Sequence, residues 1–180
     1  MIKRPLNEKL DINLMHKLIN AQGISGNESE IRKLIIKEVK KYASSIKTTK
    51  MGNLIVRKKG TGPKLMLTAH MDEIGLMVKS IDKHGKIGFS TIGGIVSDVL
   101  VGERVHIQGK KDKIFGIITC DQISNDEEIS ERIELKDMYV DTGYWKPKLK
   151  KLGIEVGNYI TFEPHGNCPC HKKLLFGKAL

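Results

Sequence analysis

The spacing of apolar residues changes abruptly at Gly75, and this change constrains the fold of the 180-residue chain more than any other feature. Between residues 6 and 42, apolar side chains recur at the spacing of amphipathic helices. From Gly75 onward, short β-rich runs alternate with glycine turns, which is typical of a small β-barrel or sandwich. The sequence therefore predicts a helical beginning followed by a β unit.

Two helices are predicted in the first part of the chain. The first follows Pro5 and places the apolar residues of 6–19 on one face. The second is expected to start after the break at residues 23–26, because Ser25 and Glu28 have the types and spacing of an N-terminal capping box. Its inward face then holds the apolar residues between Ile31 and Tyr42.

Three strands are predicted before Gly75. Residues 46–50 and 54–57 are expected to form a hairpin around a turn at residues 51–53. Residues 64–69 contain the unbroken apolar run Leu65–Leu67, without alternation, which favours a strand covered on both faces, as in the central sheet of an α/β protein. We therefore expect the helices to pack on a central sheet that contains this strand.

The β unit is expected to be inserted into the α/β part of the chain. Its predicted strands are residues 76–81, 86–91, 104–108, 114–120, 138–140 and 159–163, with one short helix at about 147–152. A strand-like apolar run then returns at residues 172–180. The expected domains are residues 1–72 as the first part of an α/β domain, 73–165 as an inserted β-barrel, and 166–180 as the return to the first domain.

The positive charge of the chain does not by itself indicate a nucleic-acid partner. There are 31 Lys and Arg residues against 21 Asp and Glu, a net charge of +10, but only five of the cations are arginine and they are dispersed. Arginine is the residue that reads bases and grips phosphate, and stacking aromatic residues are scarce as well. We expect no specific nucleic acid as a partner, and we interpret lysine runs such as residues 146–151 as solvated faces.

Composition also bears on the compartment. The chain has three cysteines, two of them in the Cys168-Pro-Cys170 run, which fits a reducing cytoplasm better than a disulfide framework. No apolar stretch approaches the roughly 18 residues of a membrane span. We therefore expect a cytoplasmic protein with no membrane partner.

The strongest candidate site follows the apolar run of residues 64–69. Ligands gather at the carboxyl ends of strands in open α/β sheets. His70 and Asp72 are two positions apart, so in an extended segment they project to the same side. A carboxylate that holds the far nitrogen of an imidazole orients a metal-binding histidine, and Glu73 adds negative charge nearby. This pattern indicates a metal site, although the same residues also suit an ordinary polar strand end.

A set of short motifs adds a family resemblance to this pattern. They are SGNE at residues 25–28, GNLI at 52–55, AHMDEIG at 69–75, IGG at 92–94, DTG at 141–143 and LGIEVGN at 152–158. In this order and spacing, the chain resembles the dinuclear-metal aminopeptidases of the tetrahedral aminopeptidase and glutamyl aminopeptidase type, some of which are called cellulase M. The resemblance covers essentially the whole chain, and the AHMDEIG string is its most specific part.

The resemblance implies a function and roles for particular residues. His70 is similar to the family's first metal-ligating histidine, and Asp72 to the catalytic-site carboxylate that supports it. Residues 73–165 match a lid that also mediates subunit contacts. The implied protein is a hydrolase that uses two zinc or cobalt ions to remove N-terminal residues from peptide substrates, and it forms a homo-oligomer.

The same resemblance implies that most of the metal site is missing. In the family, the run that matches residues 177–180 continues into an Asp-Asp-Arg or Asp-Asn-Arg stretch whose first Asp bridges the metals, and this chain stops one residue short of it. We expect at most one partial metal site and no activity from the 180 residues alone. An alternative is a non-catalytic remnant that associates with itself or with a full-length relative through its β lid.

Other metal ligands and another hydrolase class receive less support. Cys168, Cys170 and His171 are close together, but proline restricts the cysteines and structural zinc sites use wider spacing. A glucanase needs two carboxylates that flank a sugar bond, and the sequence nominates no such pair.

Overall fold

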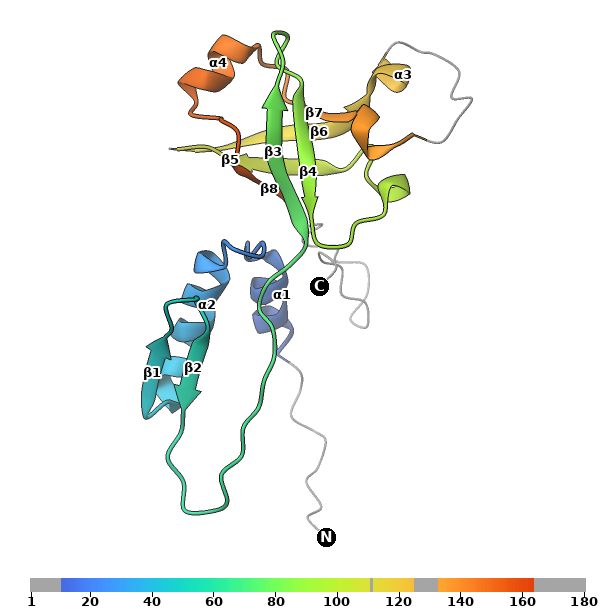
Figure 1. The fold of residues 1–180 in the computed structure, drawn as a ribbon. Coiled ribbons are helices and arrows are strands. Elements are labelled where there is room, and N and C mark those ends of the chain that lie inside the picture. The colour runs from blue at the N-terminus through green and yellow to red at the C-terminus, as the bar shows by residue number, and fades with distance from the viewer. Residues whose placement is uncertain (1–10, 111, 125–132, 164–180) are drawn as a thin grey trace.

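The computed structural model describes residues 11–110, 112–124 and 133–163. The chain forms a helical part at one end and a closed β-barrel at the other, joined by an extended segment that enters the barrel (Figure 1). Helices, a hairpin and a barrel in one chain confirm the predicted mixed class with a small β-barrel.

The helical part consists of two helices and one hairpin. Its elements are α1 (Ile12–Asn20), α2 (Ser29–Val39), η1 (Lys40–Tyr42), β1 (Ser45–Thr48) and β2 (Leu54–Arg57). Asp11 caps the start of α1, because its side chain accepts a hydrogen bond from the backbone N–H of Leu14 and so satisfies one free donor of the first turn. The hairpin reverses at Gly52, which has a φ of 89° that glycine adopts without strain. The predicted hairpin is thus confirmed.

The predicted start of the second helix was wrong. Helix α2 begins at Ser29, after Glu28, and the side chain of Ser25 does not cap it. The Ser25 hydroxyl instead bonds to Asp72, and the Glu28 carboxylate accepts a hydrogen bond from the backbone N–H of Gly26. A long-range partner outside the helix therefore replaces the expected local cap.

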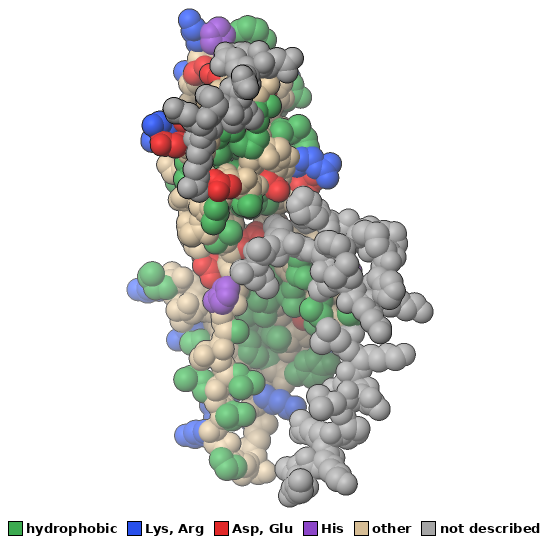
Figure 2. Space-filling model, turned by 90° about the vertical axis from the view of Figure 1, so that its right-hand side faces the viewer, with side chains coloured by type: hydrophobic (Ala, Val, Ile, Leu, Met, Phe, Trp, Pro, Cys, Tyr) green, Lys and Arg blue, Asp and Glu red, His purple; other side chains and the backbone are tan. Residues whose placement is uncertain are grey.

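The prediction of a buried central strand at residues 64–69 was also wrong. These residues form no strand, and Leu65, Met66 and Leu67 are 83% to 87% exposed. An extended segment becomes a strand only where another strand pairs with its backbone groups, and the described part of the chain provides none beside it. Hydrophobic side chains accordingly show at the surface of the lower, helical half of the molecule in Figure 2.

The barrel closes through antiparallel pairs in the order β3-β4-β7-β6-β5-β8. Its strands are β3 (Gly75–Ile81), β4 (Ile87–Ile92), β5 (Arg104–Gln108), β6 (Lys113–Cys120), β7 (Met138–Asp141) and β8 (Tyr159–Phe162). Each predicted strand of the β unit matches one of them. The first and last strands close the barrel by pairing Leu76 with Ile160.

The barrel has a continuous apolar core because its strands alternate inward and outward side chains. On β6, for example, Ile114, Ile118 and Cys120 point inward, whereas Phe115 and Ile117 are exposed. The core residues lie between Leu76 and Ile160, and the side chain of Leu149 joins them from a short helix. Among the described residues, none before Leu76 contributes a side chain to this core.

The remaining elements decorate the barrel. They are η2 (Ser97–Val99), α3 (Asp121–Ser124), η3 (Leu135–Asp137) and α4 (Lys146–Lys151). Helix α4 confirms the predicted short helix, whereas the sequence pattern did not predict α3. The predicted run at 172–180, the return segment 166–180, and Cys168, Cys170 and His171 lie outside the described residues. None of the helices in the described ranges is long and apolar enough to cross a membrane.

Candidate metal-binding site

The site is built where the extended segment meets the helical part. Residues 70–73 run alongside residues 22–25, with a parallel bridge between Ile24 and Glu73. Backbone hydrogen bonds from Glu73 to Gly23 (2.8 Å) and from Ser25 to Glu73 (3.2 Å) fix this alignment. Side chains from two distant parts of the sequence therefore meet at one place.

His70 and Asp72 lie next to each other, as their spacing predicted. The Nδ1 atom of His70 is 3.1 Å from Oδ1 of Asp72 and 3.1 Å from its backbone carbonyl oxygen. Because both partners are acceptors, Nδ1 is the nitrogen that carries the hydrogen and donates it. The second nitrogen, Nε2, is then left with its lone pair, which is the form in which imidazole binds a metal ion.

Ser25 secures the other oxygen of Asp72. Its hydroxyl donates a hydrogen bond of 2.5 Å to Oδ2 of Asp72. This bond is the main reason that the pKa of Asp72 lies below its usual value, and the hydrogen bond from His70 acts in the same direction. Asp72 is therefore held as a carboxylate whose two oxygens have different partners.

Glu73 has a structural place in the site. It is buried, and its Oε1 accepts a hydrogen bond of 3.1 Å from the backbone N–H of Gly23. The predicted negative charge near His70 is thus used to hold the segment that carries Ser25. This contact indicates that Glu73 aligns the two segments; it is a poorer match to a second metal ligand.

Two small hollows adjoin His70. One of about 160 Å³ is lined by Glu28, the Met51–Asn53 turn, His70 and Asp72. Arg32 holds two parts of this lining in place: its guanidinium lies 3.3 Å from the Glu28 carboxylate and also packs against Gly52. The other hollow, of about 220 Å³, is mostly apolar and is lined by residues of α1 and α2 together with His70. The imidazole therefore stands between a polar and an apolar recess.

The residues fit one ligand of a metal site and the carboxylate that orients it. The His70 side chain is 69% exposed, so its free nitrogen can reach an ion. Within residues 11–110, 112–124 and 133–163, however, there is no group of three or more His, Cys, Asp or Glu side chains that could hold a metal. Catalytic zinc sites generally use three protein ligands, so His70 needs further ligands from elsewhere.

Sequence reasoning missed two contributors to this site, Ser25 and Glu28. Both belong to the SGNE motif, which was assigned to helix capping. Residues of these types suit a helix cap as well as a polar site. Which of the two they form depends on whether residues 70–73 lie alongside. Only the membership of SGNE in the same set of family motifs as AHMDEIG could have linked them.

Known proteins resemble this chain over most of its length. The sequence model of the M42 glutamyl aminopeptidase family matches residues 52–180. An aminopeptidase homologue of Acetivibrio thermocellus is 39% identical over 157 residues, which is 87% of this chain and 46% of that protein. The lysyl aminopeptidase of Pyrococcus furiosus is 32% identical over 161 residues, again 87% of this chain and 46% of the relative. The chain thus spans about half the length of the curated relatives it matches.

Solved structures of TET peptidases also resemble this chain over most of its length. The TET aminopeptidase of the Thaumarchaeota archaeon SCGC AB-539-E09 has a TM-score of 0.77 and 31% identity, covering 85% of this chain and 44% of that one. The TET1 peptidase of Pyrococcus horikoshii, which can assemble into a tetrahedron or a large octahedral shell, has a TM-score of 0.74 and 31% identity, covering 86% of this chain and 47% of its own.

Proposed function

Because the chain belongs to the M42 glutamyl aminopeptidase family, we propose that it forms part of a metal-dependent aminopeptidase that removes N-terminal residues from peptides. The observation that carries this proposal is the pairing of Nδ1 of His70 with Asp72, which leaves Nε2 free to bind an ion. This imidazole–carboxylate arrangement is the usual way in which a metal-ligating histidine is oriented.

In this proposal His70 is a metal ligand, Asp72 positions it, and Ser25 positions Asp72. A pair of divalent ions, zinc or cobalt, would supply polarisation of the scissile carbonyl and activation of the attacking water. The pKa of Asp72 is lowered, so its carboxylate stays ionised. Its negative charge would also stabilise positive charge that a bound ion brings to the imidazole of His70. We propose that the other ligands and the proton-shuttling glutamate come from sequence outside these 180 residues, because the relatives are about twice as long.

Two chains test this proposal. The first is the 180-residue chain, and the second is the same chain extended by the second half of a family member. Both are loaded with zinc or cobalt and assayed on aminoacyl-anilide substrates. We expect turnover only from the extended chain, and we expect His70→Ala to abolish it. His84→Ala, which removes an exposed histidine from a barrel turn, is the matched control and should leave turnover unchanged.

A metal titration separates ligand from support. Asp72→Asn in the extended chain should weaken metal binding by about 10- to 100-fold, the usual cost of losing such a supporting group. Metal-dependent turnover by the short chain that disappears in His70→Ala would contradict the proposal of an inactive half. Normal turnover by His70→Ala in the extended chain would contradict the role of His70.

We also propose that the protein forms a homo-oligomer, and this holds equally for a non-catalytic remnant. The support comes from the TET1 neighbour, which assembles into shells, and from Phe115 and Ile117, which project outward from β6 with 44% exposure each. Light scattering should show assembly that Phe115→Lys with Ile117→Lys reduces. Val96→Lys with Val99→Lys is the matched control, and loss of assembly in that variant alone would place the contact elsewhere.

A cytoplasmic location is part of the same proposal. Cys120 is buried in the barrel as a free thiol, which is consistent with a reducing compartment. Fractionation of the source cells with an antibody to the chain tests it.

A further inference from the structure

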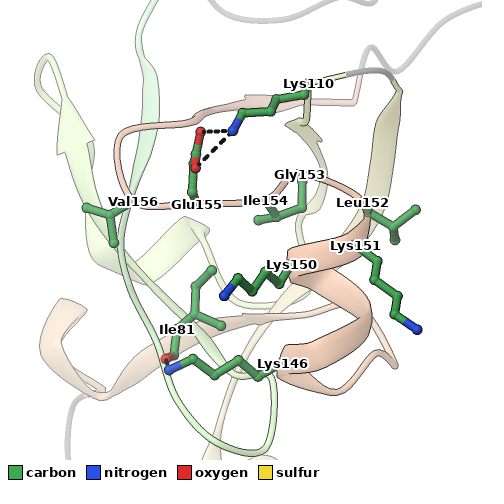
Figure 3. A pocket seen from close by; sticks show the side chains of 10 residues that line it. All are labelled: Ile81, Lys110, Lys146, Lys150, Lys151, Leu152, Gly153, Ile154, Glu155 and Val156. Atoms are coloured by element: carbon green, nitrogen blue, oxygen red, sulfur yellow. Dashed lines mark hydrogen bonds and ion pairs between the residues drawn. The ribbon is translucent and has the colours of Figure 1, made fainter.

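A lysine-lined hollow of about 540 Å³ lies beside α4 (Figure 3). It is at the end of the barrel away from α1 and α2, so it is separate from the site at His70 (Figure 1). Lys146, Lys150 and Lys151 line it from α4, Lys110 lines it from the loop after β5, and the strand end Ile81 and residues 152–156 complete it. The size lies within the range of sites for small ligands and short peptide segments.

The charges of this hollow do not cancel. Glu155 is the one acidic residue among its lining residues, and it pairs with Lys110 at 3.0 Å. Nζ of Lys146 donates a hydrogen bond of 2.8 Å to the carbonyl oxygen of Ile81, which fixes the position of the ammonium group and leaves its charge uncompensated. Lys150 points into the hollow from the same side as Lys146, whereas Lys151 points outward (Figure 3).

The structural needs of α4 account for Lys150 and Lys151, which stand in its last turn, but not for Lys146. Cations are favourable in the last turn of a helix but unfavourable in the first turn, where Lys146 stands. Lys146 and Lys150 are four residues apart on the same helix face, and like charges at this spacing oppose helix formation. An anionic ligand between them would convert this repulsion into attraction.

The other lining residues indicate the character of the ligand. Ile81, Leu152, Ile154 and Val156 give the hollow an aliphatic wall. The lining contains no aromatic side chain on which a nucleobase could stack and no arginine to grip a phosphate. Carboxylates that alternate with aliphatic side chains match both the lysines and the apolar wall.

We propose that this hollow binds acidic peptide segments, with Lys146 and Lys150 contacting the carboxylates. The net charge of +10 also attracts polyanions in general, so the test must separate a site from bulk charge. Binding here requires neither metal nor hydrolysis. A failure of this proposal therefore leaves the aminopeptidase proposal intact, and the reverse also holds.

The test measures fluorescence anisotropy of a labelled peptide of alternating Glu and Leu added to the 180-residue chain at about 150 mM salt. Lys146→Gln with Lys150→Gln should weaken binding about tenfold. Lys33→Gln with Lys37→Gln removes two exposed lysines at the same spacing on α2 and should change binding less than twofold. Circular dichroism of each variant confirms that it is folded.

A second measurement locates the ligand on the unaltered protein. A nitroxide on the Glu-Leu peptide should broaden backbone amide signals of residues 146–156 and leave those of α2 sharp. Equal losses from the two double variants, equal binding of a Gln-Leu peptide, or broadening away from residues 146–156 would each overturn the proposal. An oligothymidylate that binds with the same dependence on Lys146 and Lys150 would overturn it in favour of a nucleic-acid site.

Discussion

The hydroxyl of Ser25 donates a hydrogen bond to Oδ2 of Asp72, across a separation of 47 residues in the sequence. This bond joins the loop between α1 and α2 to the extended segment that carries His70. It shows that the candidate site depends on the docking of two segments.

We predict that Ser25→Ala destabilises the protein by about 1 kcal/mol, the usual value of a hydrogen bond to a charged group after partial exposure is considered. Urea unfolding at neutral pH measures the change. Ser29→Ala, which removes an exposed hydroxyl at the start of α2, is the control and should change the free energy of unfolding by less than about 0.5 kcal/mol. Equal effects would show that the bond to Asp72 contributes nothing.

The ion pair between Lys86 and Asp121 should make stability depend on pH. Their hydrogen bond raises the pKa of Lys86 and lowers the pKa of Asp121. The pair therefore stabilises the fold above the ordinary Asp pKa of about 3.9 and below the ordinary Lys pKa of about 10.4. This contribution is lost as the pH falls through the lowered pKa of Asp121 or rises through the raised pKa of Lys86.

Asp121→Asn should accordingly cost about 0.5 kcal/mol at pH 7, since both side chains are partly exposed and solvent screens the pair. The cost should shrink as the pH falls through the lowered pKa of Asp121, where the carboxylate takes up a proton. Lys86→Met should cost more, because Nζ of Lys86 also lies 4.5 Å from the centre of the Tyr139 ring. Urea titrations across this pH range measure both. A pH-independent difference between Asp121→Asn and the unaltered chain contradicts the prediction.

Gly85 is required in the turn between β3 and β4. It has a φ of 91°, and a Cβ at this position would collide with the backbone carbonyl of Tyr144. Gly85→Ala should therefore lower the free energy of unfolding by about 2–4 kcal/mol. Gly94→Ala is the control, because open space surrounds Gly94, and thermal unfolding should separate the two variants clearly.

Ile24 joins the helical part to the barrel. It is 1% exposed, and its side chain packs against Gly75 next to the backbone of Ile160. Ile24→Ala should cost about 2–4 kcal/mol through the cavity it creates. Hydrogen exchange should show that amide protection is lost mainly in α2 and residues 22–25. Ile12→Ala, at a position that is 43% exposed, is the control and should change amide protection little in either the helical part or the barrel.

We propose that residues 73–165 form a domain that folds by itself, with residues 1–72 and 166–180 belonging to another. The support is that the barrel core lies between Leu76 and Ile160. A chain of residues 73–165 should unfold cooperatively and keep the amide protection of the barrel strands. Val140→Ala in the barrel core should lower its stability by about 1–3 kcal/mol. A fragment without cooperative unfolding would contradict the proposed boundary.

The sequence predicted the barrel more accurately than the helical part, for a physical reason. Each barrel strand pairs with other strands of the same unit, so alternation and glycine turns carry the needed information. The run at Leu65–Leu67 has the composition of a buried strand, yet its burial depends on strands that the described chain does not place beside it. A pattern can show what a segment is suited to, but it cannot supply the partner.

The candidate site shows the same distinction. His70 and Asp72 were predictable because their contact is local and follows from a spacing of two residues. Ser25 and Glu28 were assigned to a helix cap, since capping is the common local use of these residues. The contact of Ser25 with Asp72 depends on the docking of residues 22–25 beside residues 70–73, which no local pattern contains. Glu28 keeps local contacts with Gly26 and Arg32, and only its place beside His70 and Asp72 depends on that docking.

The closure of the barrel between its first and last strands also affects how quickly the chain can fold. Leu76 pairs with Ile160, so one edge of β3 stays unpaired until β8 has formed. Contacts between such distant positions slow folding, because the intervening chain must lose much of its freedom before the contact is gained. On the ribosome, the open edge of β3 would remain uncovered until the final barrel strand emerges, and an unpaired strand edge of this kind makes a partly folded chain prone to aggregate.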